Sequence, residues 1–445
     1  MTEDRSIAII GAGLVGSLLS VYLARRGYRV TLFEKRPDPR KARYTEGRSI
    51  NLALSNRGWW PLKEIGLTES AKKMIIPMAG RMMHDESGVL TFQQYGKDGE
   101  AINSISRSGL NALLMTEAEK RGVHIIFNAA LSEIDFDQTT FTFNDAGQSR
   151  EFKAEVIIGS DGAFSVVRKF MQLTDRFNYS QHYIEHGYKE LTIPPGEDGE
   201  FQLAKNALHI WPRGNYMLIA LPNPDRSFTC TLFFPYDGDP SFSSLTTIAA
   251  ARELFKRDFP DALELMPNFD QDFEKNPTSS LVTIKCYPWV RNNTLLIGDA
   301  SHAIVPFYGQ GMNSGFEDCR VLNGLLDECK DDWKVVLRKF QNLRKKDADA
   351  ISDLAMQNFI EMRDLVGDEQ FLLRKQIEGR LYHKYPEKWV PLYSMVTFKE
   401  NLRYSEALKK GQIQKRIMDE IMADPEINNN WESLDLSKVV NQLNP

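Results

Sequence analysis

The sequence predicts an α/β protein in which a Rossmann-like nucleotide-binding domain carries an inserted antiparallel β-sheet and is followed by C-terminal helices. The N-terminus provides the first observation, because a short β-branched run, Ser6–Ile10, precedes a glycine-rich turn. Helical periodicity over Leu14–Arg26 then ends at Gly27, and Tyr28–Glu34 is a second predicted strand, which completes a βαβ opening. The other two observations are strand-like stretches in the middle of the chain and a charged, helical last quarter.

The remaining elements follow in chain order. Leu110–Lys120 is a predicted helix, and His124–Phe127 and Glu155–Gly159 are predicted strands of the first domain. Thr294–Ile297 is predicted to return to that domain as a buried strand, and from Asp332 onward the charge density and the spacing of Leu, Met and Phe indicate helices. Between them, strand-like runs separated by Pro and Gly favour an antiparallel sheet: Tyr183–Ile193, Leu208–Trp211, Tyr216–Leu221 and Ser227–Phe234. The expected divisions are residues 1–178 and 286–330 for the nucleotide-binding domain, 179–285 for the inserted substrate domain and 331–445 for the helical region.

Composition and charge exclude several classes of protein. The 445 residues carry 55 basic and 60 acidic side chains, a net charge of -5, which disfavours binding to nucleic acid. The four cysteines are scattered, without a CxxC pair or a histidine at metal-ligand spacing, so we expect no metal site and a reducing compartment. Ile7–Ala24 is uncharged and approaches the length of a membrane span, but three glycines interrupt it and Glu3 and Asp4 precede it. We therefore expect a soluble, cytoplasmic protein that does not bind a membrane.

The glycine-rich turn Gly11-Ala12-Gly13-Leu14-Val15-Gly16 lies between a strand and a helix, which is the context that a dinucleotide-binding fingerprint requires. Its glycines permit a tight turn and close approach of the backbone to a pyrophosphate, and the helix N-terminus offers N–H groups and a positive dipole end. Glu34 lies 18 residues after Gly16, where a carboxylate can accept ribose hydroxyls. The motif alone does not separate FAD from NAD. The candidate cofactor residues here are Gly11, Gly13, Val15, Gly16, Glu34, Lys35 and Arg36.

Two later motifs narrow the choice of cofactor. Gly159–Arg168 contains Asp161 after an apolar strand, and Leu295–His302 places Asp299 on a turn after another buried strand. The three motifs, in this order and at these separations, resemble those of the single-component, class A flavin-dependent aromatic hydroxylases, which share the fold of para-hydroxybenzoate hydroxylase. The resemblance implies FAD as the cofactor, with Asp161 near the place where FAD and NADPH approach and Asp299 on a ribityl hydroxyl. His302, which follows the turn, is expected to be structural.

The segment after this turn is again rich in glycine. Glycines in Val305–Gly315 let the backbone approach a flat ring, and a helix that starts near Gly311 would direct its N-terminus at the flavin pyrimidine. The helix dipole there favours the negative charge that reduced flavin carries near N1 and O2. The resemblance adds Arg107, at the start of a helix, as an FAD contact. We assign five residues to the flavin: Ala53, Arg107, Gly311, Met312 and Asn313. We assign four residues to the reaction site: Pro306, Phe307, Gly309 and Gln310.

Three stretches are similar to the kynurenine-hydroxylating members of this family. They are Glu46–Ser55, Pro306–Cys319 and Asn358–Asp364, within a similarity that runs from the N-terminus to about residue 404. The chain departs from the family at Tyr308, where Phe or His is usual, and at Ser314, where Ala is usual. Eukaryotic members end in a membrane anchor, and the polar end of this sequence predicts none. The chain therefore resembles the soluble bacterial members.

The resemblance implies both a reaction and a set of substrate residues. The reaction is hydroxylation of L-kynurenine to 3-hydroxy-L-kynurenine with NADPH and O2, through a hydroperoxide at flavin C4a. The sequence holds no second strand–GxGxxG–helix unit, which fits an NADPH that binds only briefly. The state of assembly is left open, with a homodimer as one expectation. The family's substrate residues carry over to Arg81, Tyr95, Asn358 and Tyr393, and Phe307, Met362 and Phe233 are expected to line the aromatic ring.

Two other functions stay open at this point. A hydroxylase of another small aromatic acid would share the fold, although a phenol hydroxylase needs a group that deprotonates its substrate. A non-enzymatic binding protein of the GDP-dissociation-inhibitor type also keeps this architecture. Asp299 and the glycine-rich segment after it argue against the binding protein, and the yellow colour of bound flavin would separate the two classes.

Overall fold

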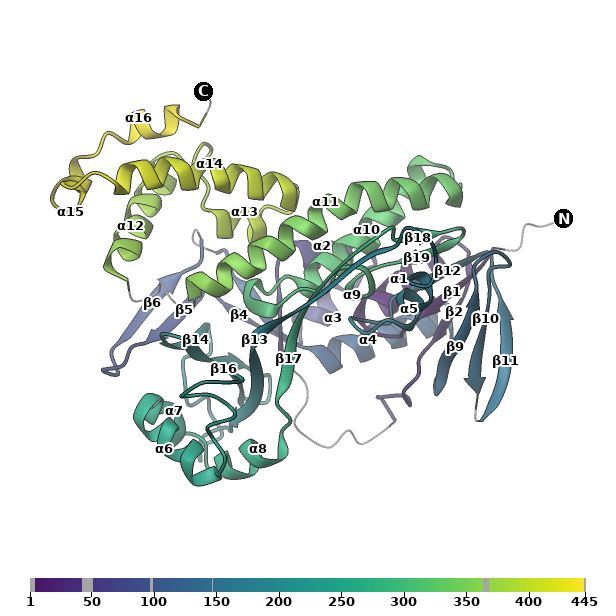
Figure 1. The fold of residues 1–445 in the computed structure, drawn as a ribbon, viewed down its shortest axis with the longest axis horizontal. Coiled ribbons are helices and arrows are strands. Elements are labelled where there is room, and N and C mark those ends of the chain that lie inside the picture. Colours follow the sequence, from purple (N-terminus) through teal and green to yellow (C-terminus); the bar gives the residue numbers. More distant parts are fainter. Residues whose placement is uncertain (1–4, 42–50, 97–98, 146, 363–367, 444–445) are drawn as a thin grey trace.

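The computed structural model describes residues 5–41, 51–96, 99–145, 147–362 and 368–443. At its centre lies a six-stranded sheet with the order β18-β19-β12-β1-β2-β8, in which every pair except β18–β19 is parallel (Figure 1). This confirms the predicted βαβ opening and the returning strand. The strands are β1 (Ser6–Ile10), β2 (Arg29–Phe33), β8 (His124–Ile126), β12 (Val156–Gly159), β18 (Val290–Arg291) and β19 (Thr294–Leu296).

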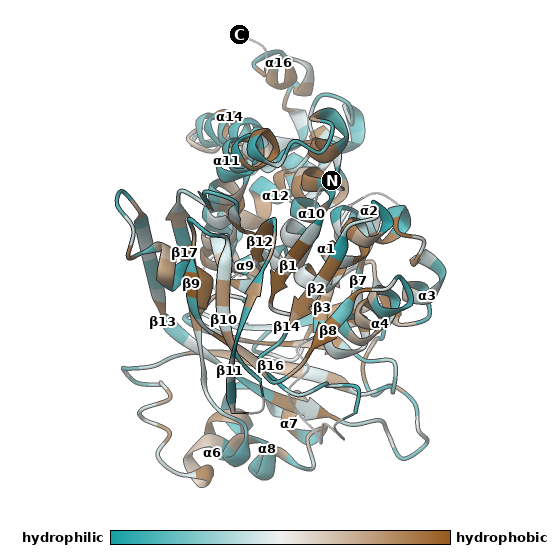
Figure 2. Ribbon diagram, turned by 90° about the vertical axis from the view of Figure 1, so that its right-hand side faces the viewer, coloured by the Kyte–Doolittle hydropathy of each residue, from teal (hydrophilic) through white to brown (hydrophobic). Residues whose placement is uncertain are grey.

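The strands at the middle of the central sheet are apolar, and helices cover them. Every residue of β1 and β12 is buried, and both strands are hydrophobic along their length (Figure 2). Such continuous apolar runs are typical of parallel strands that are buried on both faces. Side chains of these strands form one core with those of α1 (Leu14–Arg25), α4 (Arg107–Lys120) and α10 (Gly311–Glu328). Gly27, at a φ of +80°, ends the first helix as the sequence predicts.

A seven-stranded sheet with the order β17-β13-β16-β15-β14-β5-β6 forms the second layer. It is antiparallel except where β14 pairs with β5 in parallel. Two strands of this sheet come from residues 80–94, far before the predicted insertion, and the division of the chain into domains stays a prediction. The strands are β5 (Gly80–His84), β6 (Leu90–Gln94), β13 (Asn178–Ile193), β14 (Ala207–Arg213), β15 (Tyr216–Pro222), β16 (Phe228–Pro235) and β17 (Ser279–Tyr287). A separate apolar core joins the sheet to three helices: α6 (Ile248–Asp258), α7 (Pro260–Glu264) and α8 (Phe269–Lys275).

Two smaller sheets and several short helices complete the part of the fold before α10. One three-stranded sheet contains β9 (Ala129–Asp135), β10 (Thr140–Asp145) and β11 (Gln148–Lys153), and another contains β3 (Asn51–Leu54), β4 (Ile75–Met78) and β7 (Ile102–Ser106). The short helices between strands are α2 (Asn56–Glu64), α3 (Thr68–Lys72), α5 (Val166–Met171) and α9 (Asp299–His302), and η1 (Pro306–Tyr308) is a 3₁₀ turn.

The last quarter of the chain is helical, as predicted. Its first helix, α11, is the long helix that runs diagonally across Figure 1. Side chains near its start belong to the core of the central sheet, and side chains near its end belong to a second core that contains Phe307. None of the helices in the described ranges is both long enough and apolar enough to span a membrane. The helices are α11 (Trp333–Ile360), α12 (Glu369–Lys384), α13 (Leu392–Phe398), α14 (Tyr404–Met422), α15 (Ile427–Asn430) and α16 (Leu436–Asn441).

Candidate functional site

The first glycine turn is closed on one side and open on the other. Gly11 has a φ of +101°, and a Cβ there would lie 2.7 Å from the Cα of Asp161. A Cβ at Gly16 would overlap the carbonyl oxygen of Gly11, whereas a Cβ at Gly13 would meet nothing within 4 Å. The backbone of the turn is therefore tightly packed at Gly11 and Gly16. It is accessible at Gly13, which lies beside the N-terminus of α1, and no described side chain caps that end of the helix. A phosphate group can approach the helix N–H groups from that side.

Glu34 is fixed next to this turn. Its side chain is buried, and one carboxylate oxygen accepts a hydrogen bond from the Ala12 amide at 3.0 Å. The other oxygen accepts from both the backbone N–H and the Nε of Arg36, each at 3.0 Å. Lys35 and Arg36 themselves are exposed. The carboxylate is thus held beside the glycine turn, at the place where the sequence predicts a ribose contact.

Three turns meet at Val15. A Cβ on Gly298, which has a φ of +59°, would lie 3.1 Å from a methyl group of Val15, and a Cβ on Gly315 would lie 2.6 Å from it. The start of α1, the Gly298–Asp299 turn and the first turns of α10 are therefore neighbours. Asp299 is exposed at the first position of α9 and makes no hydrogen bond or ion pair with another described residue. A carboxylate in that position is available to a ligand hydroxyl.

The loop before α10 is held by the side chain of Asn313. Its Nδ2 donates to the carbonyl oxygens of Ala53 and Gly309, each at 2.8 Å, and its Oδ1 accepts from the Ser55 amide at 3.0 Å. Gly309 has a φ of +64°, and a Cβ there would come within 3.0 Å of the Ala53 Cβ. The helix begins at Gly311, so its first N–H groups have no partner within the helix. This is the positive helix end that the sequence predicts for a flavin.

One carboxylate oxygen of Asp161 accepts hydrogen bonds at the start of α5, and the other has no hydrogen-bond partner among the described residues. Its Oδ2 accepts from the amides of Val166 and Val167 at 2.6 and 3.2 Å, whereas its Oδ1 is buried without a hydrogen-bond partner. Burial raises the pKa of this carboxyl group. Arg107 is exposed in the first turn of α4. The open side at Gly13, the free Asp299 and the unpartnered Asp161 oxygen together fit a bound FAD.

A second cluster contains Arg81 of β5, Tyr95 directly after β6, and Tyr393 of α13. The two tyrosine rings stack with centroids 5.1 Å apart, and the guanidinium carbon of Arg81 lies 5.4 Å from the Tyr95 ring and 5.0 Å from the Tyr393 ring. Arg81 Nε and the Tyr95 hydroxyl are buried without a hydrogen-bond partner. Burial raises the pKa of both tyrosines, so their hydroxyl groups stay protonated and can donate.

Aromatic and apolar side chains adjoin this cluster. Phe307 stacks on Phe359 at 4.2 Å between centroids and lies 4.9 Å from the Phe233 ring. Asn358 donates from Nδ2 to the carbonyl of Phe307 at 2.6 Å and to the Met362 sulfur at 3.3 Å. The structure therefore brings all seven predicted substrate residues into two adjoining groups.

Two residues that sequence reasoning did not assign belong to the site. Tyr308, noted only as a departure from the family, stacks on Tyr393 at 5.4 Å and extends the tyrosine pair to three rings. Phe359, which lay inside a matched stretch, is the ring against which Phe307 packs. Gln310 is buried, and its Oε1 accepts from the Tyr404 hydroxyl at 2.9 Å. Parts of two matched stretches, residues 46–50 and 363–364, lie outside the described residues.

Comparison with known proteins first gives the class. The model of the FAD binding domain family matches residues 4–333. A tetrameric 2-methyl-3-hydroxypyridine-5-carboxylic acid oxygenase superposes with a TM-score of 0.68 at 19% identity, over 82% of this chain and 94% of that one. A probable FAD-dependent monooxygenase from Pseudomonas aeruginosa gives 0.64 at 18%, over 80% and 98%. The fold class is confirmed, and the chain belongs to the FAD binding domain family.

Curated relatives then give the particular family. The chain is 47% identical to a kynurenine 3-monooxygenase of Christiangramia forsetii, over 100% of this chain and 99% of the relative. It is 45% identical to the enzyme of that name from Dictyostelium discoideum, over 94% and 93%, and 44% identical to that from Anopheles gambiae, over 94% and 87%. This chain belongs to the kynurenine 3-monooxygenase family.

Proposed function

We propose that this protein hydroxylates L-kynurenine to 3-hydroxy-L-kynurenine with NADPH and O2. The observation that carries the proposal is the pair of buried, unpartnered donors at Arg81 Nε and the Tyr95 hydroxyl. Buried polar groups normally have a hydrogen-bond partner, so two unsatisfied donors on adjacent side chains support a ligand at this place. A carboxylate supplies acceptors for both donors. Kynurenine carries such a carboxylate at its amino-acid end and an aminophenyl ring at the other.

The FAD that the family binds supplies electron transfer from NADPH and activation of O2. Asp299 and Glu34 are the carboxylates that we assign to its hydroxyl groups, and the N-terminus of α1 is assigned to its phosphates. The N-terminus of α10 would face its pyrimidine. The other predicted cofactor contacts are Gly11, Gly13, Val15, Gly16, Lys35, Arg36, Ala53, Arg107, Asp161, Gly311, Met312 and Asn313.

The protein's own contribution to the reaction is the position of the substrate ring. Arg81, Tyr95 and Tyr393 would hold the carboxylate, and Phe307, with Phe233 beside it, would lie against the ring. The ring carbon next to the amino group is activated by the aniline nitrogen, so orientation and exclusion of water are what the site must provide. Pro306, Phe307, Gly309 and Gln310 form the loop between the two sites, and this position supports their assignment to the reaction.

The role of Asn358 requires a separate argument. Both bonds of its Nδ2 already go to protein atoms, the Phe307 carbonyl and the Met362 sulfur. In this arrangement Asn358 sets the position of Phe307, and a direct bond from its amide nitrogen to kynurenine requires one of those two bonds to break. Its Oδ1 remains the atom that can accept from the substrate.

The direct test uses the purified, flavin-loaded protein. NADPH oxidation is measured with and without L-kynurenine, and the product is identified by mass spectrometry. We expect kynurenine to stimulate oxidation and to be converted to a product heavier by one oxygen atom. A matched series with a hydroxybenzoate tests the alternative substrate class. Full flavin content with neither stimulation nor product from kynurenine would show that the proposed substrate is wrong.

The cysteines bear on the location of the protein. The four cysteines are free, three of them buried, which supports a reducing compartment such as the cytoplasm. A homodimer remains an expectation that gel filtration with light scattering can decide.

A further inference from the structure

A buried network of ion pairs connects α2, α10 and α11. Arg57 of α2 pairs with Glu317 of α10 at 2.8 Å, and the Arg57 side chain is 0% exposed. The second oxygen of Glu317 pairs with Arg344 of α11 at 2.7 Å, and Arg344 pairs with Asp318 at 2.6 Å. Because isolated charges are costly to bury, a chain of paired charges of this kind fixes the relative position of the three helices.

One end of this network holds the turn that presents Asp299. The Oδ2 of Asp318 accepts from the Gly298 amide at 3.1 Å and lies 2.6 Å from the Nε2 of His302. Gly298 precedes Asp299 directly, and His302 is the last residue of α9, which Asp299 begins. The position of Asp299 therefore depends on α10, through Asp318.

The other end of the network holds the segment that carries Tyr393. Arg57 Nε donates to the carbonyl of Val396 in α13 at 2.8 Å, and its Nη2 donates to the carbonyls of Lys399 at 3.2 Å and of Leu402. A cation at the carbonyl end of a helix is favourable, and here it also satisfies carbonyls that have no helical partner. The guanidinium carbon lies 4.0 Å from the ring centre of Tyr404, whose hydroxyl bonds Gln310.

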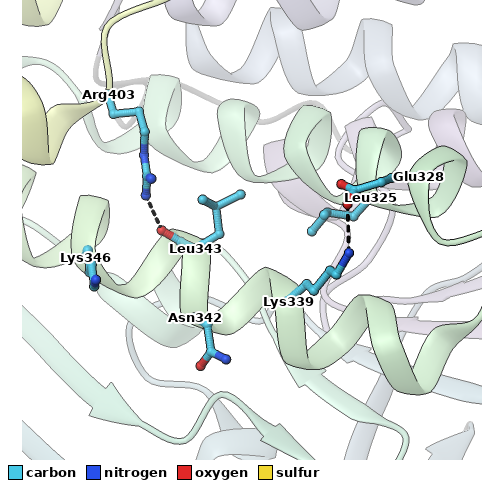
Figure 3. Close-up of a pocket in the computed structure, with 7 residues that line it drawn as sticks. All are labelled: Leu325, Glu328, Lys339, Asn342, Leu343, Lys346 and Arg403. Atoms are coloured by element: carbon cyan, nitrogen blue, oxygen red, sulfur yellow. Dashed lines mark hydrogen bonds and ion pairs between the residues drawn. The ribbon is translucent and has the colours of Figure 1, made fainter.

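The network has equal numbers of cations and carboxylates. Arg344 also pairs with Asp347 at 3.3 Å, and Arg403 pairs with Asp347 at 3.0 Å. Three arginines thus face Glu317, Asp318 and Asp347. Arg403, whose side chain is 38% exposed, is the outer member and donates to the Leu343 carbonyl at 2.7 Å beside a surface groove (Figure 3). Arg57 lies at the opposite, interior end.

We propose that Arg57 is a positioning residue that couples the substrate site to the flavin site. It holds α13 against α10 and so keeps Tyr393 next to Arg81 and Tyr95. It also fixes the distance between these three side chains and the loop before α10, which would face the flavin. Kynurenine that orders Tyr393 then also orders α10 and the Asp299 turn through Arg57 and Glu317. This inference rests on the proposed function. Arginine is required because its planar fork serves one carboxylate and three carbonyls at once, which the single ammonium group of lysine cannot do.

The test compares Arg57→Lys with Arg380→Lys in the flavin-loaded enzyme. Arg380 is the matched control, because it also donates to backbone carbonyls, those of Trp431 and Glu432, and its guanidinium carbon lies 5.2 Å from the centre of the Trp431 ring, whereas neither partner belongs to the proposed site. We expect Arg57→Lys to retain FAD, to raise the KM for kynurenine about tenfold or more, and to lose most of the stimulation of flavin reduction by kynurenine. Hydrogen exchange in residues 392–402 should slow with kynurenine in the wild type and not in this variant. Arg380→Lys should match the wild type in each measurement.

Conversion of kynurenine by the wild type is measured first. If the wild type does not convert it, the proposed function is wrong; if it does, the variants test the role of Arg57 alone. An Arg57→Lys enzyme with wild-type KM, stimulation and exchange protection would overturn the inference. So would equal losses in the Arg57 and Arg380 variants, because these would show a general effect on stability. If Arg57→Lys does not fold, Glu317→Gln replaces it, since the two carboxylate oxygens of Glu317 join Arg57 to Arg344 and an amide can accept from only one of the two arginines. That variant should show the same changes at smaller size, and a wild-type response would overturn the inference equally.

Discussion

Replacement of Arg81 by lysine is expected to weaken kynurenine binding while FAD stays bound. Arg81 lies beside both stacked tyrosines, and its Nε is buried without a partner, so we assign the substrate carboxylate to this atom as its acceptor. A charge-assisted hydrogen bond contributes about 1.5–3 kcal/mol. Since about 1.4 kcal/mol is a tenfold change in Kd, loss of one arm of a bidentate pair predicts roughly ten- to hundredfold weaker binding. Lysine keeps the charge but cannot reproduce the two parallel bonds.

The assay is a titration of the flavin absorbance of the holoenzyme with kynurenine and with an analogue that lacks the carboxylate. The wild type should bind the analogue poorly, and Arg81→Lys should weaken analogue binding little further. Peroxide released per NADPH should rise in the variant, because a loosely held ring is displaced from the reaction centre. Equal weakening for both ligands would refute the reasoning, since Arg81 would then support the shape of the site and not the carboxylate.

Three further predictions concern the flavin, the reduction step and the substrate sheet. Asp299→Ala should lose FAD or bind it weakly, and stoichiometric flavin after gel filtration would contradict the assignment. Reduction by NADPH without O2 should accelerate when kynurenine binds, because the sequence holds no second strand–GxGxxG–helix unit for NADPH, and equal rates with and without an aromatic ligand would argue against this. Burial lowers the pKa of His209 to about 4, and its Nδ1 lies 2.9 Å from Nε2 of His84. The unfolded chain therefore binds more protons below about pH 6.5, so the free energy of unfolding should fall between pH 6.5 and 4 by up to about 3 kcal/mol. In urea titrations, His209→Gln should reduce the difference between the free energies of unfolding at pH 7 and at pH 5. The same difference in variant and wild type would contradict this prediction.

The N-terminal half of the flavin site was predictable because its signals are local. The order of strand, glycine turn and helix specified β1, α1 and β2, and Glu34 followed from the length of that unit. The turn at Asp299 and the helix start at Gly311 were predictable for the same reason. Each of these features lies within a few residues of the glycine that marks it.

The substrate side depended on the family resemblance, because its members come from distant parts of the chain. Arg81 and Tyr393 are separated by more than 300 positions, and neither has a local signal of function. The parallel pairing of β5 with β14 is also non-local, so the sequence could not show that Arg81 lies on the substrate sheet. Arg57 has no motif around it, and its role depends on carbonyl groups that α13 presents only after folding.

That parallel pairing has a consequence for how the enzyme can be divided. A fragment of residues 179–285, although it holds most of the large sheet, would leave one edge of β14 unpaired and would lack Arg81 altogether. Unprotected strand edges recruit other chains, so such a fragment should aggregate when expressed alone. The N-terminal segment supplies two strands of the second sheet before the chain builds the rest of it, so this sheet cannot be completed without that segment. Recombination between relatives should therefore succeed only when residues 80–94 and the strands at 207–222 come from the same parent.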